Sequence, residues 1–144
     1  MKIVLQRVHK ASVTADGEIV GSIGKGYVVF LGIAVTDTKI TVEKLADKIA
    51  RLRIFADGDG KTNLAAKDVN GEILIISQFT LTADCSQNRP SFSSAAKPDA
   101  AKELYEYFIE QCKDKFSKAA SGRFAADMRV SCDNDGPFTL VLEG

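Results

Sequence analysis

Short apolar runs separated by turn signals make up the first part of the chain. Residues 2–8 and 11–15 are rich in β-branched side chains and predict two short strands. An Asp-Gly pair at 16–17 is typical of a two-residue hairpin turn, so residues 18–23 are predicted to form the returning strand. Residues 27–34 (YVVFLGIA) are apolar almost throughout, which indicates a strand buried on both faces.

Two later segments repeat apolar residues every three or four positions, which predicts amphipathic helices over about 40–52 and 98–116. Pro98 lies in the first turn of the second helix, where proline is tolerated. Between the helices, residues 72–79 (EILIISQF) predict another buried strand. Residues 82–97 are polar and form a connection long enough to indicate a functional loop.

The last part of the chain alternates between apolar and polar residues. Residues 122–132 predict a half-buried strand, residues 134–137 predict a turn, and residues 138–143 (FTLVLE) predict a closing strand. The order of elements predicts one α/β domain over residues 1–144. Two helices cannot cover both faces of so many strands, so we expect two packed β-sheets in a barrel-like arrangement with the helices along one side.

Charge balance and the scarcity of histidine and cysteine exclude several classes of protein. Lys plus Arg and Asp plus Glu are each 19, so a strongly basic protein that coats nucleic acid is excluded. His9 is the only histidine, and the three cysteines form no C-x-x-C pair. These counts predict no metal site, no cofactor and no disulfide framework. Without a leader-like segment or a long apolar run, the expectation is a cytoplasmic protein that does not enter a membrane.

The first candidate site is a group of polar residues at the end of a buried strand. Ser77, Gln78, Phe79 and Thr80 follow directly after the apolar run at 73–76. If the strand ends or bends near Phe79, the Ser77 and Thr80 side chains can meet on one ligand. Backbone N–H groups released from the sheet can then bind an oxyanion. The alternative is an ordinary strand end with a threonine cap.

The second candidate is the Asn-Asp-Gly-Pro segment at 134–137. A plain turn accounts for this composition. A cis bond before Pro137 would instead hold two carbonyl groups in fixed directions, as a rigid recognition element. Gly136 would let another surface come close, because glycine has no side chain.

The chain resembles the D-aminoacyl-tRNA deacylase family in five motifs that keep their order from end to end. They are IVLQRV at 3–8, SQFTL at 77–81, RPSF at 89–92, GRFAADM at 122–128 and NDGPFTL at 134–140. The resemblance implies a cytosolic homodimer that hydrolyses the ester of D-aminoacyl-tRNA and so removes D-amino acids from mischarged tRNA.

The resemblance also implies a role for each candidate residue. Gly136 and Pro137 of one subunit would reach the active site of the other through a cis bond, where their carbonyls would block an L side chain and leave a D side chain free. Arg7 would hold this motif in place. The residues implied in catalysis are Ser77, Gln78, Phe79 and Thr80. The residues implied in binding the terminal adenosine are Ala101, Phe124 and Met128.

Two consequences follow for substrate and mechanism. A site that rejects only one side-chain direction also admits glycine, so hydrolysis of glycyl-tRNA is expected. Water is expected to attack the activated ester, with the Phe79 N–H near the oxyanion and the substrate 2′-hydroxyl assisting proton transfer. The alternative makes Thr80 a covalent nucleophile, which would need an activating base.

The expected macromolecular partner is the acceptor end of tRNA, with no DNA binding. Arg89, Lys97 and Lys102 lie in or beside the long loop and are the cations available for a few phosphate contacts. Two alternatives stay open. One is a non-catalytic nucleic-acid-binding module that stacks bases on Phe124. The other is a related deacylase for L-amino acids, in which the Gly-Pro bond is trans.

Overall fold

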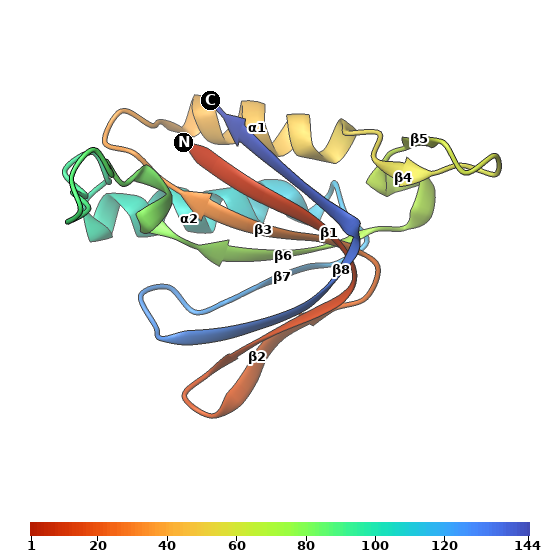
Figure 1. Cartoon of the computed structure of the whole chain (residues 1–144), viewed down its shortest axis with the longest axis horizontal. Helices are drawn as coiled ribbons and strands as arrows, with labels where there is room; N and C mark the ends of the chain where they lie inside the picture. The colour runs from red at the N-terminus through yellow and green to blue at the C-terminus, as the bar shows by residue number, and fades with distance from the viewer.

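The computed structural model describes residues 1–144, with a six-stranded sheet, a two-stranded sheet and two α-helices (Figure 1). The elements in chain order are β1 (Lys2–Ala15), β2 (Glu18–Ile23), β3 (Gly26–Gly32), α1 (Lys39–Arg51), β4 (Phe55–Ala56), β5 (Thr62–Leu64), η1 (Ala66–Val69), β6 (Glu72–Ser77), η2 (Phe79–Thr82), α2 (Pro98–Lys113), β7 (Ala119–Ser121) and β8 (Met128–Glu143). The two η elements are short 3₁₀ helices.

The six-stranded sheet is organised around the long strand β1. Its strand order is β2-β1-β3-β6-β7, and β8 pairs with β1 along almost its whole length. The pairs β3–β6 and β6–β7 are parallel, and the others are antiparallel. The sheet curls until β2 approaches β7, where a Cβ on Gly21 would lie 2.7 Å from the Ser121 carbonyl oxygen. Glycine at this position therefore permits the near closure of the barrel.

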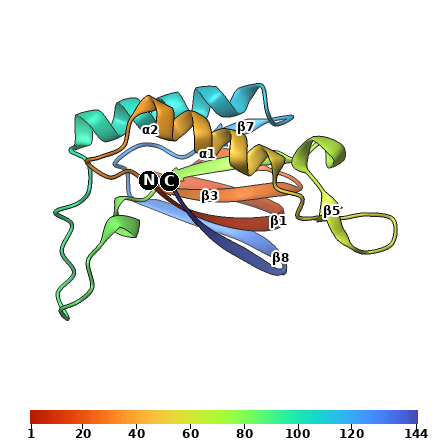
Figure 2. The same ribbon diagram turned by 90° about the horizontal axis from the view of Figure 1, so that it is seen from above.

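Two apolar cores use the two faces of this curled sheet. Strand β6 shows the division, because Ile73 and Ile75 face the helices while Leu74 and Ile76 face the barrel interior. Both helices lie on the same side of the sheet (Figure 2). This arrangement confirms the predicted α/β class, the barrel-like strands and the placement of the helices. Neither helix is long and apolar enough to cross a membrane.

The prediction of a strand over 122–132 is wrong for its first half, because β8 begins only at Met128. Residues 122–127 form a loop in which the Ala126 N–H donates to the Arg123 carbonyl over 3.2 Å. Ala125 has φ +62°, a left-handed conformation that no regular strand contains. The alternation of apolar residues there reflects a turn beside the core.

The prediction of a turn at 134–137 is also wrong, because these residues lie inside β8. The chain bends there without reversing, and β8 pairs with β1 on both sides of the bend. Residues 2–15 likewise form one strand and not two. The β1–β8 register shifts between Gln6 and Val8 and again between Val8 and Ala11. Such bulges let a strand bend sharply and continue.

The remaining differences concern short elements. The apolar pattern of residues 53–55 (RIF) predicts a short strand, and the structure places it at Phe55–Ala56 (β4). This strand pairs with Thr62–Leu64 (β5), which the sequence pattern did not predict. Helices α1 and α2 agree with the predicted segments within a few residues.

Candidate active site

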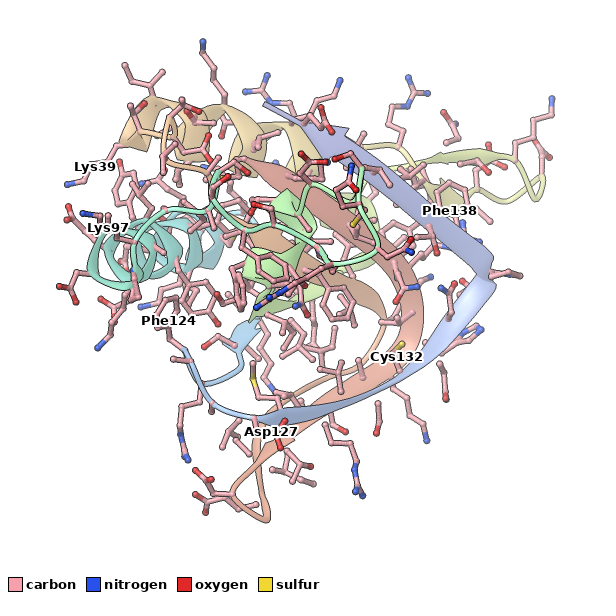
Figure 3. All side chains as sticks on the ribbon, turned by 60° about the vertical axis from the view of Figure 1, so that its left-hand side comes forward. Lys39, Lys97, Phe124, Asp127, Cys132 and Phe138 are labelled. Atoms are coloured by element: carbon pink, nitrogen blue, oxygen red, sulfur yellow. The ribbon has the colours of Figure 1, made fainter.

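A pocket of about 730 Å³ opens where β6 leaves the sheet. Its walls come from three places: the end of β6 with the start of η2, the segment leading into α2, and the β7–β8 loop (Figure 3). Thirteen of its 18 lining residues are hydrophobic. Six of the residues predicted for the site lie together here. They are Ser77, Gln78, Phe79, Ala101, Phe124 and Met128.

The end of β6 provides backbone donors at the pocket wall. The Gln78 N–H still donates to the Leu31 carbonyl over 2.9 Å, but the chain then turns into η2. The first N–H groups of a helical turn have no partner within it. The Phe79 and Thr80 N–H groups accordingly donate to no protein acceptor. Strand β6 ends at Ser77, so the condition that the first candidate site required, a strand end near Phe79, is met.

Thr80 does not line the pocket, and its surroundings do not activate it as a nucleophile. Its exposed hydroxyl accepts a hydrogen bond of 2.5 Å from the Gln78 side-chain amide. The only histidine, His9, has its Nε2 3.4 Å from an oxygen of Asp135 in the distant bend of β8. Of the two side chains, Ser77 lines the pocket and Thr80 does not.

Tyr105 of α2 supports the part of the pocket wall that carries Phe124. The Tyr105 hydroxyl donates to the Ile75 carbonyl over 2.9 Å, and its ring lies 5.7 Å from the Phe124 ring. Burial raises the pKa of Tyr105 to about 12, so its hydroxyl stays a neutral donor at neutral pH. Phe124 lines the pocket from a turn and Met128 from the first residue of β8, whereas the strand predicted over 122–132 would have placed both on one face of one strand.

Phe92 is a pocket residue that the sequence reasoning missed. Its ring packs edge-to-face against Phe79 at 5.1 Å, and both aromatic side chains remain exposed. Two backbone hydrogen bonds between Asp84 and Ser91 fold the long loop back on itself and bring Phe92 to the pocket. The RPSF motif was the signal that could have identified it. Lys97 also lines the pocket, at the start of α2.

Arg7, at the bend of β8, holds the segment that contains Gly136 and Pro137. Its Nη2 donates to the Asp135 carbonyl over 3.0 Å, and its Nε lies 3.2 Å from the Asp135 carboxylate. A further hydrogen bond reaches the Ile54 carbonyl. The guanidinium also lies 4.5 Å from the centre of the Phe138 ring, within cation–π distance. We call this group of residues, Arg7 with Asp135–Phe138, the arginine corner.

Gly136 and Pro137 form the exposed tip of the arginine corner, and the peptide bond between them is cis. Gly136 has φ +130°, which favours glycine, and a Cβ there would lie 3.3 Å from Nη2 of Arg7. Neither residue, nor Arg7, lines the pocket of its own chain. The arginine corner lies where β8 bends, at the opposite end of the sheet from η2 (Figure 1).

An apolar pocket that orients a ligand beside unpaired backbone donors suits the cleavage of an activated ester. A family model described as D-Tyr-tRNA(Tyr) deacylase matches residues 4–143. D-aminoacyl-tRNA deacylases from Lactobacillus acidophilus and Thermotoga petrophila are 51% and 49% identical to this chain and cover 99% of it. The match spans 99% and 97% of those proteins. The chain therefore belongs to the D-Tyr-tRNA(Tyr) deacylase family, which confirms the predicted family and the predicted class of enzyme, a hydrolase.

Two solved structures share the fold of this chain. A structure described as c-Myc DNA Unwinding Element Binding Protein is 40% identical, has a TM-score of 0.94, and matches all of this chain and 99% of its own. A structure described as a probable eukaryotic D-amino acid tRNA deacylase has a TM-score of 0.87 at 15% identity. It covers 98% of this chain and 97% of its own, and at that identity the likeness shows the fold alone.

Proposed function

We propose that this chain hydrolyses the ester bond of D-aminoacyl-tRNA and releases a free D-amino acid and tRNA. The observation that carries the proposal is the pocket beside η2, in which apolar walls adjoin the unpaired N–H groups of Phe79 and Thr80. The family membership gives the class of substrate. The macromolecular partner is the acceptor end of tRNA. Contact with this end alone requires few positively charged side chains, and Lys97 provides one at the pocket itself.

In this proposal the terminal adenosine occupies the apolar part of the pocket. Ala101 and Met128 contact the base, and Phe124 offers a ring against which a base can stack. The aminoacyl ester then lies near Ser77, Gln78 and the start of η2. Base and ester together fix the position of the scissile carbonyl, which lowers the entropic barrier to attack.

The attacking group is water, and the developing oxyanion accepts a hydrogen bond from the Phe79 N–H. A preorganised backbone donor of this kind contributes roughly 10²–10³ in rate. The substrate 2′-hydroxyl assists proton transfer. Thr80 is disfavoured as a covalent nucleophile because its hydroxyl accepts from the Gln78 amide and has no base beside it.

Thr80→Ala separates these two mechanisms. We expect the rate of deacylation to fall by less than about tenfold, because the contact removed is one hydrogen bond. Thr82→Ala is the matched control in the same turn, since its hydroxyl donates to the Phe79 carbonyl over 2.8 Å. A loss above about a thousandfold at Thr80 alone would establish the nucleophile instead, because it exceeds the contribution of one oxyanion donor.

Chiral selection requires a second copy of the chain in this proposal. The exposed Gly136–Pro137 tip is anchored firmly by Arg7 yet lies far from the pocket of its own chain. A homodimer that inserts this tip into the partner's pocket would use its carbonyls to reject an L side chain. A D side chain would point to open space. Glycine has no side chain to reject, so glycyl-tRNA is a substrate as well.

The test is release of amino acid from D-aminoacyl-, L-aminoacyl- and glycyl-tRNA by the purified protein. Hydrolysis of the D and glycyl esters with the L ester left intact supports the proposal, and cleavage of the L ester alone contradicts it. A second candidate is a nucleic-acid-binding module without catalysis. The exposed Phe79–Phe92 pair and the 40% identity to a protein described as binding a DNA unwinding element favour it. Such a module would leave every ester intact.

A further inference from the structure

The wall of the pocket that carries Phe124 is a strained turn. Ala125 has φ +62°, a left-handed conformation that crowds the Cβ of any residue other than glycine. The turn is closed by the Ala126 N–H, which donates to the Arg123 carbonyl over 3.2 Å. Strained backbone of this kind persists only when its surroundings hold it in place. Contacts outside the turn must therefore fix the position of Phe124.

Two side-chain contacts from outside the turn reach Phe124 and Arg123. On the inner side, the Tyr105 ring packs against Phe124. On the outer side, the Arg123 side chain crosses to the tight turn between β1 and β2. Its Nη1 lies 2.8 Å from the Asp16 carboxylate, and its Nη2 lies 3.3 Å from the Glu18 carboxylate. The β1–β2 turn and the β7–β8 loop lie on the same side of the barrel in Figure 1.

We propose that Arg123 is a positioning residue, which uses Asp16 and Glu18 to hold Phe124 in the wall of the pocket. This inference rests on the proposed function in one respect, namely that the pocket binds the aminoacyl end of tRNA. Neither carboxylate lines the pocket. Each therefore acts on substrate binding only through Arg123. Its planar guanidinium can meet both carboxylates at once, which a lysine ammonium does less well.

A direct contact between Arg123 and a tRNA phosphate is the competing explanation, because the Arg123 side chain is 46% exposed. The two explanations predict opposite effects for the carboxylates. If Arg123 positions Phe124, neutralising Asp16 and Glu18 weakens substrate binding. If Arg123 binds phosphate, the same change removes two competing negative charges, so substrate binding stays the same or strengthens.

The variants Arg123→Ala and Asp16→Asn/Glu18→Gln separate these explanations. We expect each to raise KM for D-aminoacyl-tRNA about fivefold, the size expected from losing two exposed ion pairs. We expect kcat within about twofold, because no group near the ester changes. Combining the variants should add little, since both remove the same contact. Arg123→Lys should restore part of the loss. A KM for the carboxylate variant that is unchanged or lower would overturn the proposal.

The matched control is Glu110→Gln, which removes an exposed ion pair of 2.8 Å with Lys113 at the far end of α2. It should leave KM unchanged. Thermal unfolding of all the variants provides a second check, since a shift in unfolding temperature without a shift in KM would indicate a merely structural contact and overturn the proposal.

A measurement that does not depend on activity completes the test. The chain contains no tryptophan, so Phe124→Trp introduces a single fluorescent reporter at the pocket wall. Adding Asp16→Asn/Glu18→Gln to this reporter should increase quenching by acrylamide, whereas adding Glu110→Gln should not. Equal quenching in the two backgrounds would overturn the positioning role. If quenching responds but no ester is cleaved by the unmodified protein, the proposed function fails while Arg123 still positions Phe124.

Discussion

The pocket beside η2 and the arginine corner are built by different physical means. The pocket is lined mainly by apolar side chains, and the polar groups beside it that have no protein partner are the backbone N–H groups of Phe79 and Thr80. The arginine corner depends on one charged side chain, which bonds two carbonyls and a carboxylate at once. Chemistry based on backbone groups survives many side-chain changes. A local structure that depends on a single guanidinium is lost when that side chain is replaced. Side-chain substitutions should therefore cost more stability in the arginine corner than around the pocket.

Arg7→Ala should break the arginine corner and have the largest effect on stability. The Arg7 side chain is only 13% exposed, and its removal leaves the Asp135 carboxylate and two carbonyls without their partner. We expect the free energy of unfolding to fall by about 3 kcal/mol, because a half-buried ion pair and hydrogen bonds to two carbonyls are lost together. Urea denaturation measures this loss.

Arg51→Ala is the control for Arg7→Ala. Arg51 is 80% exposed and pairs with Asp47 one helical turn away at 3.5 Å. Such a pair contributes about 0.5 kcal/mol at most. If the two arginine variants lost the same stability, the contrast between the two regions would be wrong.

Gly136→Ala should distort the tip of the arginine corner. At φ +130° an alanine is strained, and its Cβ would lie 3.2 Å from the Phe138 nitrogen and 3.3 Å from Arg7. We expect a loss of about 2 kcal/mol in the free energy of unfolding. Gly58→Ala is the matched control, because a Cβ there meets open space. Equal thermal unfolding of the two glycine variants would show that the tip carries no backbone constraint.

Tyr105→Phe, beside the pocket residue Phe124, should produce the smallest of these effects on stability. It removes the hydroxyl that donates to Ile75 while the Gly122 N–H continues to donate to the same carbonyl. We expect a loss of about 1 kcal/mol, measured by denaturation at neutral pH. Tyr107→Phe on the same helix is the control, since that hydroxyl bonds the exposed Glu43.

Alkaline pH sharpens the comparison between wild type and Tyr105→Phe. Burial raises the pKa of Tyr105 to about 12, while in the unfolded chain it is about 10. The neutral form is favoured in the folded state, so this contribution to stability is complete below pH 10 and is lost as pH rises through about 12. The Tyr105→Phe variant has no hydroxyl to ionise at this position, so its free energy of unfolding does not fall for this reason. That of the wild type does fall, so the difference between the two proteins should shrink as pH rises from about 10 to about 12. A constant difference would contradict the burial of the hydroxyl.

Local sequence patterns predicted the parts of the molecule that depend on local physics. The helical repeats, the turn at 16–17 and the end of β6 near Phe79 follow from periodicity and turn chemistry within a few residues. Six of the site residues that were predicted from the motifs also line one pocket.

The errors concern backbone that is fixed by distant partners. The turn around Phe124 is held by residues 16 and 18, more than 100 positions earlier in the chain. The bend at 134–137 is held by Arg7 from the other end of the sequence. Phe92 reaches the pocket only because the long loop pairs Asp84 with Ser91. No local pattern reports such contacts, because periodicity describes neighbours along the chain.

The pairing of β1 with β8, from Lys2 opposite Glu143 to Ala15 opposite Met128, also constrains how this protein is made. A ribosome synthesises β1 (Lys2–Ala15) long before β8 (Met128–Glu143), so one edge of β1 waits without its partner until β8 emerges. An unpaired edge is a template for association with other chains. Nascent copies crowded on one messenger RNA are therefore vulnerable until β8 has emerged, and the barrel can close only around a finished strand.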